Sequence, residues 1–130
     1  MILVDSNVLI DISIRDPKWF DWSADQLAAA MDRGDAAINP IIYAEVSVGY
    51  AGTAVLDTAL EGLLRLELPY AAAFVAGKAF QEYRRRGGAR VSPLPDFYIG
   101  AHAALVGMTL LTRDRVRYAS YFPSINLIAP

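Results

Sequence analysis

The 130-residue sequence has no cysteine, a single histidine and no long charge-free run. The absence of cysteine excludes disulfide bonds, thiolate metal sites and a cysteine nucleophile. The longest stretch without a charged residue, Phe97–Thr112, covers sixteen residues and contains two glycines. A membrane span needs about 20 mostly apolar residues, so we expect this stretch to form a buried helix and a strand instead.

The N-terminal residues also lack the features of a secretory signal. The segment Met1–Asp5 has no basic residue, and its apolar run stops after four residues. We therefore expect a soluble, cytoplasmic protein. With 55% hydrophobic residues and a net charge of −2, the chain is not disordered. Its length predicts a single domain over residues 1–130.

The acidic pI of about 5.2 by itself argues against nucleic-acid binding, but the charges are unevenly distributed. Residues 1–65 carry four basic and ten acidic side chains, and residues 66–130 carry eight basic and four acidic ones. The second half therefore has a net charge of +4, against −6 for the first. A localised basic region can bind RNA even in an acidic protein.

Short apolar runs bounded by turn residues alternate with segments of helical period. This alternation predicts an α/β fold with a central parallel sheet of four to five strands and helices on both faces. The expected strands are Ile2–Val4, Ala36–Asn39, Leu66–Leu68, Thr109–Thr112 and Asn126–Ile128. In such sheets the ligand site lies beyond the carboxyl ends of the strands.

The expected helices follow apolar stripes with helical spacing. One helix begins near Asn7, and another opens at Pro95 or Asp96 and closes near Gly107. Three further stripes are Phe20, Ala24, Leu27, Ala28 and Met31; Leu56, Ala59, Leu60, Leu63 and Leu64; and Ala72, Val75, Ala76, Ala79, Phe80 and Tyr83. The last two predict helices over Thr53–Arg65 and Tyr70–Arg86.

Three carboxylates are the only charges in otherwise apolar segments: Asp5, Glu45 and Asp96. A buried carboxylate is costly unless it is paired or binds a cation, and no lysine or arginine lies near these three in sequence. Asp5 follows the first expected strand and Asp114 follows the fourth. Glu45 lies one helical turn into the segment after the second strand, and Asp96 lies at the first turn of its helix. All four acids are therefore expected at one edge of the sheet. Glu45 is expected on the apolar face of its helix, together with Ile41, Ile42, Val48 and Gly49.

Four carboxylates in one pocket repel each other unless a cation lies among them. Oxygen ligands without cysteine, in a chain with one histidine, favour a hard cation such as Mg²⁺ or Mn²⁺ over zinc. Metal-assisted hydrolysis of a phosphodiester is a reaction that such a site suits.

Each acid also has a simpler interpretation. Asp5 or Ser6, Asp96 and Asp114 have residue types and positions typical of helix caps or turns. Glu45 has no capping role in the middle of a helix, and the four acids together favour a site.

Other chemically distinctive residues fit structural roles. His102 is expected to be a core or interface residue, because it points away from Asp96 on an ideal helix. Trp19 and Trp22 are expected to pack. Arg84–Arg86 before two glycines is typical of a helix C-terminus, although Arg86 is kept as a candidate RNA contact. The arginines that flank Asp114 are further candidates for phosphate contacts: Arg113, Arg115 and Arg117.

Taken together, the acids and the residues beside them resemble the PIN-domain nucleases. The resemblance rests on Asp5-Ser6-Asn7, on Glu45, on Asp96 and on Thr112-Arg113-Asp114. The segments Leu94–Ala103 and Tyr121–Pro130 are similar to VapC toxins of bacterial toxin–antitoxin systems. The resemblance covers the chain from the first expected strand to residue 130.

The resemblance implies a PIN-like three-layer fold and a metal-dependent endoribonuclease that leaves 3′-hydroxyl and 5′-phosphate ends on tRNA or rRNA. It implies Asp5 and Asp96 as main metal ligands, supported by Glu45 and Asp114. The side chains that would orient carboxylates or water are Ser6, Asn7 and Thr112. It further implies a VapB-type antitoxin partner and a homodimer.

Other classes fit less well. A haloacid dehalogenase needs an acid where Asn7 stands, a response regulator needs a lysine near its last strands, and no phosphate-binding glycine motif is present. The alternative that stays open is a non-catalytic PIN-like module that binds RNA or protein. The helices expected at Thr53–Arg65 and Tyr70–Arg86 are the predicted groove for the antitoxin.

Overall fold

The computed structural model describes all 130 residues. Its core is a five-stranded sheet in which every neighbouring pair is parallel, in the order β3-β2-β1-β4-β5. The strands are β1 (Ile2–Val4), β2 (Ala36–Ile38), β3 (Leu64–Arg65), β4 (Thr109–Leu111) and β5 (Leu127–Ile128). The helices are α1 (Ser6–Ser13), α2 (Phe20–Asp32), α3 (Pro40–Ser47), α4 (Thr53–Ala59), α5 (Tyr70–Arg85), α6 (Pro95–Val106) and α7 (Arg115–Tyr121).

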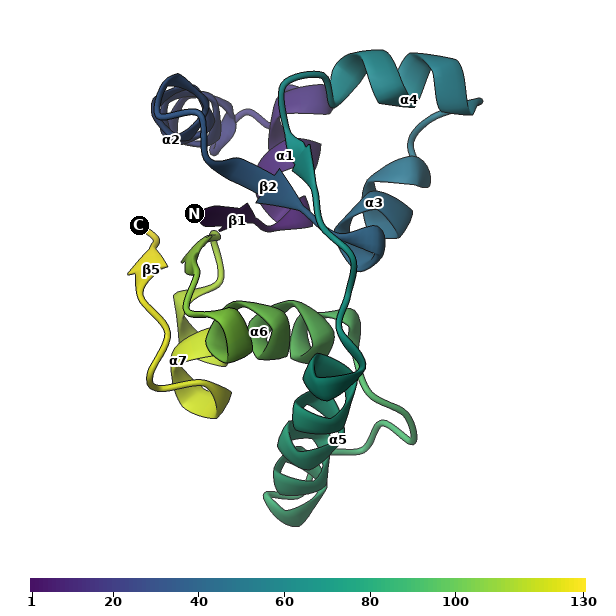
Figure 1. Cartoon of the computed structure of the whole chain (residues 1–130), viewed down its shortest axis with the longest axis vertical. Coiled ribbons are helices and arrows are strands. Elements are labelled where there is room, and N and C mark those ends of the chain that lie inside the picture. The colour runs from purple at the N-terminus through teal and green to yellow at the C-terminus, as the bar shows by residue number, and fades with distance from the viewer.

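The helices form layers on both sides of the sheet, which confirms the predicted three-layer α/β fold (Figure 1). Helices α1, α2 and α4 lie on one side, and α5, α6 and α7 lie on the other. Helix α5 packs mainly against α6 and projects beyond the sheet. None of the helices has the length and apolar character to cross a membrane.

The three inner strands, β1, β2 and β4, have three residues each and form the buried centre of the sheet. All residues of β1 and β2 are buried, as are two of the three in β4. This burial on both faces explains why these strands read as continuous apolar runs rather than as alternating patterns. The central position of β1 brings its carboxyl end beside those of β2 and β4.

Two helix ends follow directly from residue chemistry. Asn39 caps α3, because its side-chain oxygen accepts a hydrogen bond of 3.0 Å from the backbone N–H of Ile42, and Pro40 occupies the first turn. Gly107 ends α6 in the left-handed conformation, with φ of 72°. The expected helix from Pro95 to Gly107 is therefore confirmed.

The third strand was predicted wrongly. It lies at Leu64–Arg65, where Ala37 pairs with Leu64, and not at Leu66–Leu68. The N–H of Leu66 still bonds to the carbonyl of Ile38, at 2.9 Å, but the chain then leaves the sheet toward α5. Leu66 and Leu68 pack against the core from this extended segment, so apolar residues alternate with polar ones here as they would in a half-buried strand.

The helix predicted over Thr53–Arg65 is also too long, since α4 ends at Ala59. The buried face of α2 differs from the predicted stripe as well. Ser23 and Ala30 are its fully buried residues, and Ala28 is exposed. Ser23 donates a hydrogen bond of 2.8 Å to Asp11 on α1, which accounts for a polar side chain in the buried face of α2.

Candidate metal centre

The centre lies at the carboxyl edge of the sheet, where the chain leaves the central strands. Asp5 follows β1 directly, and its backbone N–H extends the ladder by bonding to the carbonyl of Leu111 at 2.9 Å. Glu45 lies on α3, after β2, and Asp96 lies in the first turn of α6. The adjacency of β1, β2 and β4 thus collects residues far apart in sequence.

Three of the four predicted acids converge there. One carboxylate oxygen each of Asp5, Glu45 and Asp96 lies within 4.8 Å of the others. Asp5 is 2% exposed, and the other two are partly buried. The apolar face predicted for Glu45 is only partly correct: Ile42 is buried, but Val48 is 88% exposed because α3 ends at Ser47.

Asp5 is held by hydrogen bonds from two directions. Its Oδ1 accepts from the backbone N–H of Ser6 at 2.8 Å, so Asp5 caps α1 and also faces the other carboxylates. Its Oδ2 accepts from the Thr112 hydroxyl at 2.7 Å. The Ser6 hydroxyl in turn donates to Glu45 Oε1 at 2.8 Å, which joins α1 to α3. The cap interpretation is therefore correct for Asp5, and the cap leaves this carboxylate facing Glu45 and Asp96.

Thr112 connects the centre to the loop that follows β4. Its Oγ1 accepts from the side chain of Asn7 at 3.2 Å and from the backbone N–H of Asp114 at 3.0 Å. Asn7 Oδ1 accepts from the backbone N–H of Arg113 at 3.2 Å. The predicted supporting residues Asn7 and Thr112 thus fix this loop and the Asp5 carboxylate together.

Burial, followed by nearby negative charges, raises the pKa values of the three clustered acids. For Asp5, burial is the main cause and brings the pKa to about 6, with the Thr112 hydrogen bond acting in the opposite direction and the charge of Asp96 adding to the rise. Burial also raises the pKa of Glu45 and of Asp96. The charged form of each carboxylate is therefore less stable here than it is in water. A bound cation would stabilise the charged forms and lower these pKa values.

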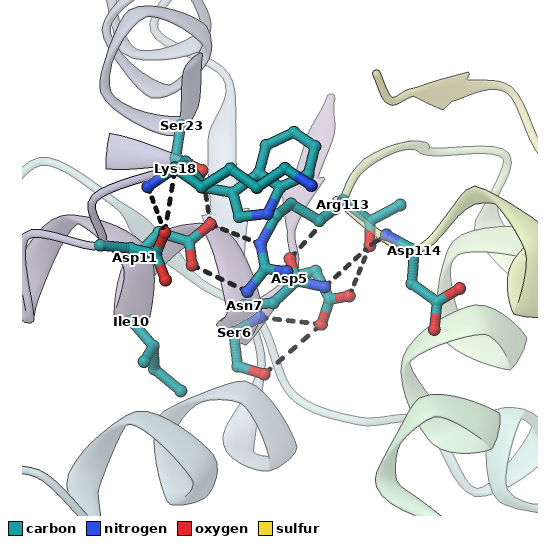
Figure 2. Close-up of polar contacts among 12 residues, drawn as sticks. Asp5, Ser6, Asn7, Ile10, Asp11, Lys18, Ser23, Arg113 and Asp114 are labelled. Atoms are coloured by element: carbon teal, nitrogen blue, oxygen red, sulfur yellow. Dashed lines mark hydrogen bonds and ion pairs between the residues drawn. The ribbon is translucent and has the colours of Figure 1, made fainter. Parts of the chain in front are cut away.

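Asp114 lies beside the cluster rather than in it. It caps α7, because its Oδ1 accepts from the backbone N–H of Arg117 at 3.1 Å. In Figure 2 its carboxylate is turned away from Asp5. The cap interpretation of Asp114 is therefore correct, whereas that of Asp96 is wrong, because Leu94 is the capping residue of α6.

Arg117 links Asp114 to the cluster. Its Nη1 lies 3.4 Å from Asp96 Oδ2, and its Nε lies 4.0 Å from Asp114 Oδ2. The positive charge of Arg117 lowers the pKa of Asp96, whereas burial and the charge of Asp114 raise it. Asp96 therefore has a basic partner that lies far away in sequence.

The donor set of the cluster fits a hard divalent cation. Three carboxylates from different elements offer oxygen atoms, and the Ser6 and Thr112 hydroxyls hold two of them in orientation. No sulfur ligand is available, because the chain has no cysteine. Asp5, Glu45 and Asp96 are the residues that would hold the ion.

A second buried carboxylate, Asp11, was missed by the sequence analysis. It is 1% exposed and accepts two hydrogen bonds from the guanidinium of Arg113, at 2.7 and 2.8 Å. The hydroxyl of Ser23 adds a third, at 2.8 Å. Figure 2 shows the Arg113 side chain reaching across the start of α1 to Asp11. The signal in the sequence was an acid in the apolar run that follows Asn7.

Tyr118 was missed too. It is 0% exposed, and its hydroxyl lies close enough to Asp5 and Asp96 to lower their pKa values, yet it forms no well-aligned hydrogen bond. Burial and the nearby carboxylates raise the pKa of Tyr118 well above 10. The only feature of the sequence that could have placed Tyr118 near the acids is its position four residues, or about one helical turn, after the capping Asp114.

The other candidate residues lie outside the cluster. Arg115 donates to the carbonyl of Ala129 at 2.9 Å, and Arg86 lies at the end of α5. His102 is buried in the core, with its Nδ1 3.0 Å from the side-chain nitrogen of Asn39, as expected for a core histidine. Trp19 packs against Trp22, with ring centroids 6.1 Å apart.

Comparison with known proteins identifies the family. The sequence profile of the PIN domain matches residues 2–120. The chain belongs to the PIN-domain family. A sequence search finds no significant match among curated proteins.

Several solved structures, among them a toxin–antitoxin complex, have the same fold. A chain of VapBC2 from Rickettsia felis, bound to a DNA fragment from its promoter, has a TM-score of 0.74 and 19% identity, covering 100% of this chain and 99% of that one. A toxin–antitoxin complex from Klebsiella pneumoniae has a TM-score of 0.73 and 26% sequence identity, and the match covers 98% of this chain and 96% of that one. FitAcB from Neisseria gonorrhoeae has a TM-score of 0.70 and 19% sequence identity, and the match covers 98% of this chain and 96% of that one. This PIN domain therefore shares its fold, over nearly the whole chain, with proteins of such complexes.

Proposed function

We propose that this PIN domain is a Mg²⁺- or Mn²⁺-dependent endoribonuclease. The observation that carries the proposal is the convergence of Asp5, Glu45 and Asp96 within 4.8 Å at the carboxyl edge of the sheet. A bound divalent cation supplies positive charge for the phosphate and activates water for attack. Hydrolysis by water breaks the bond from phosphorus to the 3′ oxygen, which leaves a 3′-hydroxyl and a 5′-phosphate.

The chain's own residues prepare this site. Thr112 and Ser6 donate hydrogen bonds to Asp5 and Glu45, which fixes the direction of their free lone pairs. Arg117 lies against Asp96 and Asp114, at the rim, where it can turn to a phosphate of the substrate. Asp114 is proposed to support the centre from this rim.

We further propose that the protein is the toxin of a toxin–antitoxin pair, with tRNA or rRNA as its substrate and with its activity in the cytoplasm. The fold similarity to proteins solved as toxin–antitoxin complexes supports a VapB-type antitoxin as partner. The groove predicted between the helices at Thr53–Arg65 and Tyr70–Arg86 is wrong, because α4 and α5 lie on opposite sides of the sheet (Figure 1). Each helix instead presents exposed apolar side chains of its own, Val55 on α4 and Tyr70 and Phe74 on α5, as separate docking surfaces for the antitoxin. We propose residues 1–130 as one domain that forms a homodimer.

A cleavage assay tests the nuclease proposal. Purified protein is incubated with cellular RNA in Mg²⁺, Mn²⁺ or EDTA, beside Asp96→Asn and the exposed control Asp25→Asn on α2. We expect cleavage with either metal, none in EDTA, and a loss of at least about a hundredfold in Asp96→Asn only. Cleavage that persists in EDTA, or that Asp96→Asn leaves unchanged, would reject the mechanism.

The competing function is a PIN-like module that binds RNA or protein without catalysis. RNA binding without cleavage in any metal would favour it. Co-expression with a small protein encoded beside this chain tests the antitoxin separately, since failure to form a stable complex would contradict the pairing. Light scattering on the purified chain tests the dimer.

A further inference from the structure

We propose that a hollow beside the metal centre binds one nucleobase of the RNA substrate, next to the phosphate that is cut. This inference rests on the proposed nuclease function and adds to it a binding subsite for one base of the substrate. The hollow has a volume of about 360 Å³, within the range of small-molecule sites. It is lined by Tyr83, Asp114, Val116, Arg117, Ser120 and Tyr121.

The hollow adjoins the carboxylate cluster. Arg117 lines the hollow and also lies 3.4 Å from Asp96, and Asp114 lines the hollow beside it. A phosphate bound at the carboxylates therefore has its neighbouring nucleotide at the mouth of this hollow. The charge of Arg117 faces both positions.

Two tyrosine rings form the wall of the hollow, and a buried ring holds them in place. The centroids of Tyr83 and Tyr121 lie 6.3 Å apart, and both pack against Phe97, at 5.6 and 5.3 Å. Phe97 is 0% exposed and follows Asp96 directly. The wall is therefore rigidly connected to a metal-binding residue, and partly exposed tyrosine rings are typical stacking surfaces for single-stranded RNA bases.

Arg86 adds a positive charge beside this wall. Its guanidinium lies 4.7 Å from the ring centroid of Tyr121 and donates to the Ser120 hydroxyl at 2.8 Å and to Glu82 at 3.1 Å. These two bonds use two of its five N–H groups, so the others are available for a phosphate or a base edge. The predicted RNA contact of Arg86 thereby acquires a specific place.

The lining favours RNA over an apolar protein side chain. Val116 is the only aliphatic residue of the hollow, and the rest are tyrosines, arginine, aspartate and serine. Aromatic faces combined with arginine and hydroxyl groups match the π-face, phosphate and polar edges of a nucleotide.

The test measures binding without turnover. The probe is a short single-stranded oligouridylate with one internal 2-aminopurine, in Ca²⁺ in place of Mg²⁺, and a gel confirms that the probe stays intact. Stacking of 2-aminopurine on a tyrosine quenches its fluorescence. We expect quenching with the wild-type protein.

Two variants test the hollow in different ways. Ser120→Leu fills it from an exposed position of α7, and the matched control Ala119→Leu adds the same volume at the exposed neighbouring residue. Arg86→Gln removes the guanidinium, with Arg85→Gln as control on the same helix. We expect Ser120→Leu to raise the Kd roughly tenfold and abolish quenching, Arg86→Gln to raise it severalfold, and both controls to keep wild-type values.

The outcomes separate the subsite from the nuclease function. Quenching that Ser120→Leu abolishes supports the subsite even if no metal supports cleavage. Normal cleavage with no quenching, or with equal Kd values for Ser120→Leu and Ala119→Leu, overturns the subsite and leaves the nuclease intact. A hollow that receives a partner protein instead would also show no change in RNA binding, and would overturn the proposal.

Discussion

Arg117 lies against Asp96, with 3.4 Å between Nη1 and Oδ2, so the guanidinium occupies the position of a counter-ion at the candidate metal centre. A bound cation has to share Asp96 with this arginine or displace it. Removing Arg117 takes away a competing positive charge, while the pKa of Asp96 rises because Arg117 lowers it. At a pH well above that pKa, the first effect dominates.

We therefore expect Arg117→Gln to bind Mn²⁺ more tightly at pH 8, by a factor between about 1.5 and 5, as befits a partly exposed ion pair. Titration calorimetry measures the Kd. Arg115→Gln is the control, because Arg115 bonds to the carbonyl of Ala129 instead. Weaker Mn²⁺ binding in Arg117→Gln would show that Arg117 supports the metal site rather than competing with the ion.

The raised pKa of Asp5 predicts that the metal-free protein loses stability as the pH rises. The folded state keeps the Asp5 proton up to a pKa of about 6, whereas the unfolded chain releases it near 3.8. The folded state therefore binds more protons between these values, and the free energy of unfolding falls across this window, by up to about 3 kcal/mol for Asp5. Urea unfolding in EDTA at pH 4.5 to 7.5 measures the fall.

Asp5→Asn provides the comparison, since it has no proton to lose and should flatten this part of the profile. Added Mn²⁺ should restore stability to the wild-type protein at pH 7.5, and less so at pH 5, where protons compete for the carboxylates. Equal slopes for the wild type and Asp5→Asn would argue against the raised pKa.

Thr112→Val is expected to destabilise the metal-free protein by about 1–3 kcal/mol, because it leaves the buried Asp5 Oδ2 and two donors without their partner. The same change should raise the pKa of Asp5 further, since the Thr112 hydrogen bond lowers it. Thr112→Ser keeps the hydroxyl and should stay near wild type. Denaturant unfolding over a pH series measures both effects, and a Thr112→Val protein with unchanged stability would contradict them.

Arg113→Met is expected to cost about 3–5 kcal/mol of stability, because it leaves the carboxylate of Asp11 buried without its charge partner. Arg33→Met, which breaks the exposed pair with Asp35, should change stability little. Urea midpoints compare the two. Unchanged stability together with weaker RNA binding would instead confirm Arg113 as the phosphate contact that the sequence suggested.

The sequence predicted the centre better than the contacts around it. Asp5, Glu45 and Asp96 were visible because each is an isolated charge in an apolar segment, and a buried charge needs a reason. The pairing of Arg117 with Asp96 depends on how α7 is rotated, and sequence patterns do not fix that rotation. Asp114 illustrates the same limit, because its position after β4 was correct while its side chain faces the start of α7.

The fold shows a similar division. The inner strands and α6 were predictable, because continuous apolar runs and a closing glycine have few alternatives. The edge strand β3 was placed too late, since Leu66 and Leu68 pack on the core from a segment without a full ladder. The buried face of α2 includes Ser23, which bonds to Asp11 on α1, and hydrophobic periodicity does not reveal such a polar contact between helices.

The central place of β1 in the sheet determines when a newly made chain can assemble the candidate metal centre. Asp5 is among the first residues synthesised, but β1 pairs with β4, and the Asp5 side chain accepts from Thr112. A ribosome-bound chain therefore cannot assemble the centre until residue 112 has left the exit tunnel. Any activity of the proposed nuclease therefore has to wait until β4 has emerged and paired with β1.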